Sequence, residues 1–272
     1  MSSGKVTGLW IYPVKSCRGI ALTEMQIGPT GPVHDRQWML VDQQNNFITL
    51  RTHSQLAEIK TALQGPFLHL YAGTNKILIN TTEECKSIET ITVWGDSFLA
   101  GVEGKDVNEA LSDFLSASVK LVRYQKESFR DLESAGTMVV KETMFADGRP
   151  VLLANENSLI DLNNKLIAQG KDLSQMERFR ANIVIDGLEA FAEDRIQEVQ
   201  IGQAIFTNPK LCARCPIVTQ DIETGKVVSN ETLKTLAGYR KVGSGNAVMF
   251  GLNLTPSKLG WVRLNDPVQI LR

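Results

Sequence analysis

The sequence is poor in cysteine and histidine and has no surplus of either charge. Four cysteines and three histidines occur in 272 residues, too few for the disulfide framework of a secreted scaffold. The formal net charge is −1, which argues against a general nucleic-acid-binding protein, because such proteins carry a basic excess. This balance still allows a local basic pocket.

Long apolar segments are also missing. No run approaches the ~18 apolar residues that cross a membrane, and the first residues contain no apolar signal core. We therefore expect a cytoplasmic protein with no membrane association. Hydrophobic residues make up 43% and charged residues 22% of the chain, which excludes a disordered or fibrous protein and indicates a folded one.

The first half of the chain shows short strands joined by turns. The pattern predicts strands over residues 6–12, 38–42, 47–51, 67–71, 76–80, 91–94, 97–101 and 120–124. Three of the turns between them have the polar or glycine-containing sequences of hairpin loops. Many short strands at regular spacing favour a barrel or a sandwich over a parallel α/β sheet.

Helical periodicity is confined to three places. The first helix is expected at 107–115 after a cap at Asp106, and the second at 158–169, with Leu159, Leu162, Leu166 and Ile167 inward and Gly170 as its stop. A short helix is expected at 232–238.

The second half also contains apolar segments typical of strands. Strands are expected at 151–154, 183–185, 198–201, 204–207 and 267–271, and the segments 216–221 and 226–229 flank a turn. A polar stretch at 125–149 reads as an irregular connection, so we place a domain boundary there and expect domains over 1–124 and 125–272. The predicted fold is mainly β with a few helices.

A CxxC motif, Cys212-Ala213-Arg214-Cys215, is the first candidate site. Arg214 would favour the thiolate form of a neighbouring cysteine, and thiolates bind soft metals. A structural zinc site would need two further ligands, and a thioredoxin-like site would need a following helix in a βαβ unit. On the motif alone, two buried cysteines acting as small hydrophobic residues are favoured.

Two N-terminal segments carry candidate anion-binding side chains. Lys15 and Ser16 follow a strand that ends at a proline, and such a turn can hold an anion or can be an ordinary solvated turn. Arg36 lies just before the next expected strand, at 38–42. Its guanidinium can bind a phosphate in bidentate fashion or can pair with Asp35.

Candidate residues in the second half lie next to expected strands. Arg180 and Asn182 are two residues apart on an extended segment and therefore face the same side; the first suits an anion and the second the edge of a heterocycle. Asp147 precedes the strand at 151–154 and can also be a turn residue.

Taken in order, these segments resemble a known family. The chain is similar to proteins with a MOSC N-terminal β-barrel domain followed by a MOSC domain, among them the bacterial YcbX-type proteins and the mitochondrial amidoxime-reducing components. The resemblance runs through IYPVKSCRG, DRQWMLVD, FADGRPVLLANENSL, FRANIVIDG, CARCPIVTQDIETG and FGLNL. It implies two successive β-barrel domains.

The resemblance implies a molybdenum–pterin (molybdopterin) cofactor held through one protein cysteine. Cys215 matches that metal ligand, and Asp147 matches an acidic residue near the metal. The positions that match cofactor-binding residues are Lys15, Ser16, Arg36, Arg180, Asn182 and Arg214. The family implies reduction of N-hydroxylated compounds such as hydroxylamines, amidoximes and N-hydroxylated bases.

Two features shape this expectation. We expect no C-terminal ferredoxin domain of the YcbX type and no targeting segment, and therefore expect electrons from a separate flavin or iron–sulfur protein. The alternative is a sulfur carrier or sulfurtransferase that holds a persulfide on Cys215 for the assembly of a metal–sulfur centre. A carrier or sensor of the cofactor without turnover is a third interpretation.

Overall fold

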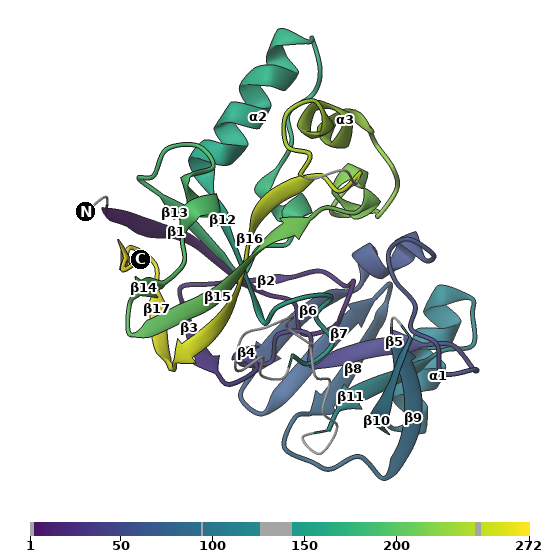
Figure 1. The fold of residues 1–272 in the computed structure, drawn as a ribbon. Helices are drawn as coiled ribbons and strands as arrows, with labels where there is room; N and C mark the ends of the chain where they lie inside the picture. Colours follow the sequence, from purple (N-terminus) through teal and green to yellow (C-terminus); the bar gives the residue numbers. More distant parts are fainter. Residues whose placement is uncertain (1–2, 94, 126–142, 243–245) are drawn as a thin grey trace.

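Strands from distant parts of the chain close into a barrel in this computed structural model (Figure 1). The structure describes residues 3–93, 95–125, 143–242 and 246–272. Around the barrel lie, in order, β13 (Ile183–Asp186), β12 (Val151–Asn155), β16 (Met249–Lys258), β15 (Ala204–Ala213), β14 (Val199–Ile201), β18 (Pro267–Ile270) and β1 (Ser3–Ile11). The pairing of β1 with β13 closes the ring. Only β12 and β13 run parallel among these described strands.

The N-terminal half forms two smaller sheets beside the barrel, at the lower right of Figure 1. One contains β5 (Trp38–Val41), β11 (Lys120–Tyr124), β10 (Asp96–Val102) and β9 (Ser87–Val93), and the other contains β6 (Lys60–Gln64), β7 (Phe67–Ala72) and β8 (Asn75–Asn80). Both sheets contribute to one apolar core, together with the helix α1 (Lys105–Leu115). Strand β5 is buried on both faces: Trp38 joins this core, and Met39 joins a second one on the other face.

The first thirty residues attach to the barrel, not to the N-terminal sheets. After β1, the short strand β2 (Ile20–Leu22) pairs back onto it. Strand β3 (Glu24–Gly28) then pairs with β4 (Gly31–Pro32) and with β17 (Gly260–Arg263). The expected domain limits, 1–124 and 125–272, stay a prediction.

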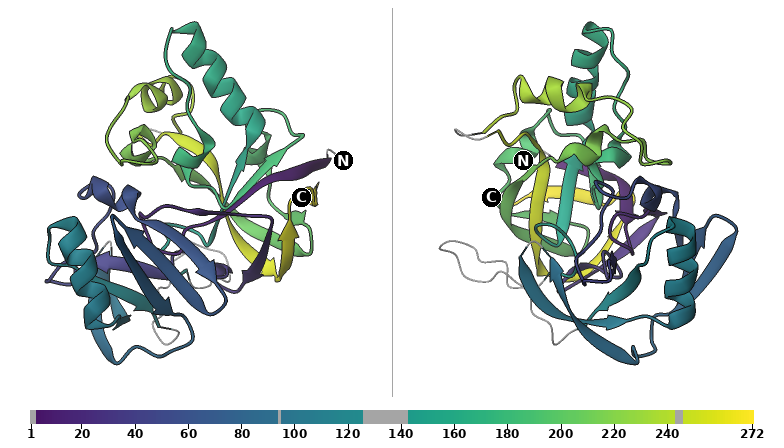
Figure 2. Two further views of the ribbon diagram at one scale, coloured as in Figure 1. Left: turned by 180° about the vertical axis from the view of Figure 1, so that it is seen from behind. Right: turned by 90° about the vertical axis from the view of Figure 1, so that its right-hand side faces the viewer.

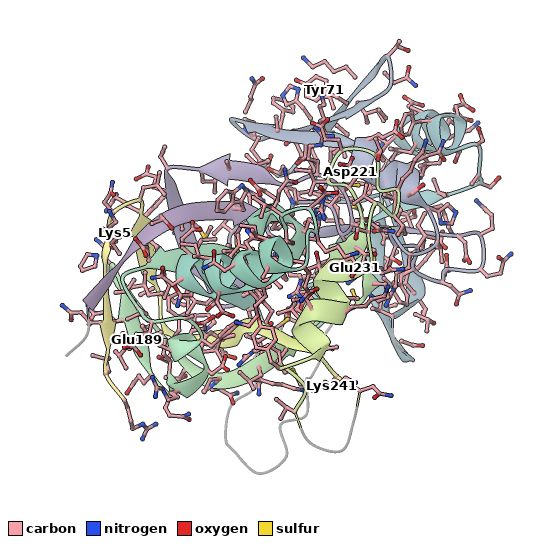
Figure 3. All side chains as sticks on the ribbon, turned by 90° about the horizontal axis from the view of Figure 1, so that it is seen from above. Lys5, Tyr71, Glu189, Asp221, Glu231 and Lys241 are labelled. Atoms are coloured by element: carbon pink, nitrogen blue, oxygen red, sulfur yellow. The ribbon has the colours of Figure 1, made fainter. Side chains whose placement is uncertain are left out.

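The longer helices of the second half cover one end of the barrel (Figure 2). They are α2 (Glu156–Ala168) and α3 (Glu231–Ala237), and short 3-10 helices lie at Ser54–Glu58, Met176–Phe179, Ala192–Arg195 and Pro216–Thr219. Seen from above, α2 and α3 lie over the barrel, and the loop at Asp221 reaches the N-terminal half (Figure 3). That loop is held there by the Gln220 amide, which donates to the Leu50 carbonyl at 2.9 Å. No helix within the described ranges is long and apolar enough to cross a membrane.

Most predicted strands and helices are confirmed, with corrections at three local features. The segment 47–51 makes only one bridge, Val41 to Phe47, because the chain turns at Thr49, whose carbonyl accepts from Thr52 and His53. The segment after Cys215 is a 3-10 helix, which Pro216 favours at its first position. Only the bridge from Gln220 to Val227 remains of the expected pairing there.

The two longer helices differ from expectation in detail. Helix α1 is capped by Gly104, so Asp106 lies in its first turn, where a negative charge still stabilises the helix N-terminus. Ile167 is 60% exposed, because it lies about 100° around the helix from Leu166 and outside the narrow buried stripe. No strand was predicted over Met249–Lys258, where the structure has β16. Most of the connection at 125–149 lies outside the described residues.

Candidate functional site

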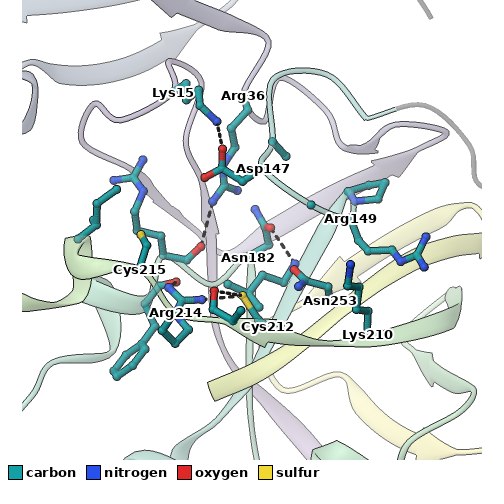
Figure 4. Close-up of a pocket in the computed structure, with 18 of the residues that line it drawn as sticks. Lys15, Arg36, Asp147, Arg149, Asn182, Lys210, Cys212, Arg214, Cys215 and Asn253 are labelled. Atoms are coloured by element: carbon teal, nitrogen blue, oxygen red, sulfur yellow. Dashed lines mark hydrogen bonds and ion pairs between the residues drawn. The ribbon is translucent and has the colours of Figure 1, made fainter. Parts of the chain in front are cut away.

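A cavity of about 790 Å³ lies between the barrel and the N-terminal sheets (Figure 4). All eight predicted site residues line it: Lys15, Ser16, Arg36, Asp147, Arg180, Asn182, Arg214 and Cys215. They come from positions up to 200 residues apart (215 − 15 = 200). The fold therefore assembles in one place the residues that the sequence presents as separate motifs.

Lys15 and Asp147 form an ion pair at the upper side of the cavity in Figure 4. Lys15 is buried and also donates to the Phe145 carbonyl at 2.7 Å. The Asp147 side chain is 58% exposed. The pair thus ties the segment before β12 to the turn after β1, with a buried cation and a carboxylate that remains open to solvent.

Three of the predicted residues adopt left-handed backbone conformations. The φ angles are 70° at Ser16, 49° at Arg36 and 55° at Arg180. This region costs a non-glycine residue about 1–2 kcal/mol, and such conformations concentrate at functional sites. In this fold they turn the chain sharply at the ends of elements and bring these side chains to the cavity wall.

Arg36 and Arg180 share one aromatic platform, the ring of Tyr12. Their guanidinium carbons lie 4.3 and 4.1 Å from its centroid. Arg36 also donates to Asp35 Oδ2 at 2.5 Å and to the Arg180 carbonyl at 3.0 Å, and Arg180 donates to the Cys17 carbonyl at 2.9 Å. The pairing of Arg36 with Asp35 is therefore formed, while the guanidinium still lines the cavity. Burial lowers the pKa of Arg180 and raises that of Tyr12.

Asn182, the residue before β13, connects β12 and β1 where the barrel closes. Its Oδ1 accepts from the Leu152 amide at 3.1 Å, and its Nδ2 donates to the Trp10 carbonyl at 3.2 Å. Its backbone bonds to the same two residues. The side chain is thus committed to β12 and β1, and cofactor binding by Asn182 stays a prediction.

The Arg214 side chain forms a hydrogen bond with Cys212, the first cysteine of the CxxC motif. Its Nη1 donates to the Cys212 sulfur at 2.9 Å and its Nη2 to the Phe179 carbonyl at 2.7 Å. Arg214 bonds to Cys212 because the backbone at the end of β15 is extended, and residues two apart on such a backbone face the same side. The expectation that Arg214 favours the thiolate form of Cys215 stays a prediction.

Cys215 lies at the start of the 3-10 helix Pro216–Thr219 and is half-buried in the cavity wall. All four cysteines are free. The described residues contain no group of three or more His, Cys, Asp and Glu that could hold a metal ion. Cys215 thus places a single sulfur atom in the cavity wall.

Sequence reasoning missed three cations of the same cavity: Arg51, Arg149 and Lys210. Arg149 lay inside the motif FADGRP, but neither Arg51 nor Lys210 carried a local signal. Together with the four cations expected, the described lining holds seven cationic side chains and one acidic one, Asp147. In a chain of net charge −1, this concentration of positive charge favours an anionic ligand.

A smaller cavity of about 220 Å³ adjoins this wall. Arg180 and Ile217 line both cavities, and Tyr12 and Trp10 line only the smaller one. Tyr12 was not predicted as a site residue, although it lies in the motif IYPVKSCRG. Its ring packs against Arg36 and Arg180 from the side of the smaller cavity.

Comparison with known proteins agrees with this architecture. Residues 3–118 match the MOSC N-terminal beta barrel domain, and residues 140–269 match the MOSC domain. The chain is 31% identical to mitochondrial amidoxime-reducing component 1 of Homo sapiens, covering 98% of this chain and 83% of that protein. It is 30% identical to mitochondrial amidoxime reducing component 2 of Rattus norvegicus, covering 97% and 82%.

A plant protein shares the same region. Molybdenum cofactor sulfurase of Arabidopsis thaliana is 30% identical over 89% of this chain, which spans only 32% of that protein. The family resemblance predicted from the ordered motifs is confirmed by these matches. The chain belongs to the family of MOSC proteins that carry a MOSC N-terminal beta barrel domain followed by a MOSC domain.

Proposed function

We propose that this protein is a molybdenum-cofactor oxidoreductase that reduces N-hydroxylated compounds, namely hydroxylamines, amidoximes and N-hydroxylated bases. The observation that carries the proposal is a single cavity that holds the Cys215 thiol among seven cationic side chains. The two relatives at 30% and 31% identity, which align over nearly the whole chain, are amidoxime-reducing components by name.

The free donors of the cavity fit an anionic pterin cofactor. Two lining arginines, Arg149 and Arg214, have a buried Nε without a hydrogen-bond partner among the described residues. Arg36 uses two of its five N–H donors in the contacts described above. Unpaired buried donors are costly, so a phosphate and electron-rich sulfurs would satisfy groups that the protein leaves unsatisfied.

Each part of the cavity then has a chemical task. Lys15, Ser16, Arg36, Arg180 and Arg214 would hold the cofactor, and the soft Cys215 sulfur would be a metal ligand. When bound, the cofactor supplies two-electron oxygen-atom chemistry.

Asp147 is the proposed proton carrier. Its Oδ1 is paired with Lys15, and the carboxylate is open to solvent. A proton can therefore pass between bulk water and the cavity at this carboxylate.

The first test is elemental analysis for molybdenum, with the fluorescence of the oxidised pterin released by acid. The protein must come from a host that makes the cofactor. Near-stoichiometric molybdenum with a pterin signal is expected, followed by reduction of a hydroxylamine and an amidoxime with a chemical reductant. Neither metal nor pterin from a competent host would contradict the proposal.

Substitution of the metal-binding cysteine provides the matched control. Cys215→Ser should abolish turnover without unfolding the protein, because oxygen is a harder ligand than sulfur. Cys85→Ser, outside the cavity lining, should keep full activity. Normal turnover by Cys215→Ser would show that the ligand is misassigned.

A sulfurtransferase is the second candidate, since one relative is a molybdenum cofactor sulfurase by name. In that function a sulfane-sulfur donor would load Cys215 as a persulfide. The outer sulfur would pass to a metal–sulfur centre with two electrons from a separate reductant, and Cys215 would return to the thiol. Mass spectrometry of metal-free protein would then show the added mass of one sulfur atom on Cys215. An unmodified Cys215 in protein that contains molybdenum favours the reductase.

The electron donor and the cellular location belong to the same proposal. We propose that electrons come from a separate flavin or iron–sulfur protein and that the protein is cytoplasmic. Reconstitution of turnover with a purified reductase tests the first, and cell fractionation tests the second. Turnover with chemical reductant but with no reductase of either class would contradict the donor assignment.

A further inference from the structure

Asp35 is a buried carboxylate beneath the arginines of the site. It is 3% exposed and does not line the large cavity. It lies in the turn between β4 and β5, where its neighbours His34 and Arg36 have φ angles of 65° and 49°. A left-handed residue on each side is a strained backbone arrangement, and it directs this carboxylate inward beneath the cavity.

The Asp35 carboxylate accepts hydrogen bonds from both Tyr12 and Arg36. Its Oδ1 accepts from the Tyr12 amide at 2.8 Å, and its Oδ2 accepts from Arg36 Nη1 at 2.5 Å. The backbone amide of Asp35 donates to the Pro32 carbonyl at 3.0 Å, which fixes the turn. Asp35 thus joins Tyr12, the residue that follows β1, to the turn that carries Arg36.

The two positive charges near Asp35, on Arg36 and Arg180, are stabilised by a negative charge beside them. Arg36 and Arg180 lie against the same Tyr12 ring, and like charges this close repel each other strongly in a site of low dielectric. Burial raises the pKa of Asp35, and the adjacent Arg36 opposes that rise. Glu177 also acts electrostatically on Tyr12. Among the described residues, Asp35 is the carboxylate that forms an ion pair with one of these two arginines, Arg36.

We propose that Asp35 is a positioning residue for anion binding, which acts through Arg36 and Tyr12 to hold the two guanidinium groups ready for a phosphate. The inference deepens the proposed function, since the phosphate there belongs to the cofactor. Asp35 does not touch the ligand. It fixes the direction of Arg36, whose remaining donors line the cavity.

The positioning role and simple electrostatics predict opposite changes in anion affinity when the charge of Asp35 is removed. Removal of a negative charge next to a cationic site should by itself tighten anion binding, because the potential of the site becomes more positive. Loss of a positioning contact should weaken anion binding, because the guanidinium is no longer held in the binding geometry. The direction of the change therefore decides between the two effects.

The test is isothermal titration calorimetry of the full chain, produced without cofactor, with inorganic pyrophosphate as the probe. Asp35→Asn should weaken pyrophosphate binding about tenfold, or about 1.4 kcal/mol. Asp172→Asn removes the same charge from an exposed position and should leave the affinity unchanged. Unchanged or tighter binding by Asp35→Asn overturns the proposal, as does wild-type protein that does not bind pyrophosphate.

A double-mutant cycle tests whether Asp35 acts through Arg36. The loss caused by Asp35→Asn should largely disappear in the Arg36→Gln background, because contacting residues are coupled. An equal loss in both backgrounds would overturn the proposal. If Asp35→Asn does not fold, as judged by circular dichroism, Arg36→Lys decides: it keeps the charge but loses the fork, and should bind pyrophosphate as weakly.

The pyrophosphate measurement separates failure of the positioning inference from failure of the proposed function. Pyrophosphate binding is measured without molybdenum or turnover, so a protein that lacks the cofactor still reports on Asp35. A tenfold loss together with absent molybdenum would reject the reductase alone. Normal molybdenum content with unchanged pyrophosphate binding in Asp35→Asn would reject the positioning inference alone.

Discussion

Replacement of Asn182 by alanine should destabilise the protein before any cofactor is considered. The side chain is 1% exposed and bonds to the Leu152 amide and the Trp10 carbonyl. Leu152 is also buried, so its N–H would lose its hydrogen-bond partner at a cost of about 1–3 kcal/mol. The lost bond to Trp10 adds about 1 kcal/mol. We expect the free energy of unfolding to fall by about 2–4 kcal/mol.

Urea unfolding of cofactor-free protein, followed by far-ultraviolet circular dichroism, measures this change. Asn253→Ala is the matched control, because Asn253 lines the same cavity and no hydrogen bond of its side chain occurs among the described residues. That control should lose less than about 0.5 kcal/mol. A similarly small loss for Asn182→Ala, with reduced cofactor content, would refute the structural assignment and show that Asn182 serves mainly as a ligand.

Three further predictions concern burial. Leu166→Ala should cost about 2–5 kcal/mol, whereas Ile167→Gln should change the unfolding free energy by less than about 0.5 kcal/mol; equal losses in thermal or urea unfolding would contradict the observed helix orientation. Burial raises the pKa of Glu193 above its usual 4.5. The protonated Glu193 carboxyl therefore contributes to the folding stability below pH 4.5, and this contribution is lost as pH rises through the pKa of the folded state. Glu193→Gln should therefore flatten the dependence of Tm on pH in that range, and an unchanged profile would contradict this. Burial also raises the pKa of Cys17 to about 12, so iodoacetamide at about pH 8 should alkylate Cys215 first; mass spectrometry that shows Cys17 modified first would refute it.

Local patterns were sufficient to predict many elements and the separate motifs. The hairpin of β7 and β8 and the presence of α2 follow from alternation, helical spacing and turn residues within a few positions of each other. The order of the motifs was sufficient to predict the family. These features depend on near neighbours in the chain or on the motifs themselves, so they are visible without coordinates.

Contacts between distant residues decided the remainder. The barrel closes where Lys5 pairs with Asp186, a pairing that no local pattern specifies. The cavity gains Arg51 and Lys210 because two halves of the chain meet there.

The partners of the site residues likewise depend on the tertiary structure. Arg214 pairs with Cys212, and Asn182 binds backbone groups, because strand direction and barrel closure set which groups come within hydrogen-bond distance. A sequence specifies which side chains can donate or accept. Only the packing of strands far apart in the chain determines which of these groups meet and which stay free for a ligand.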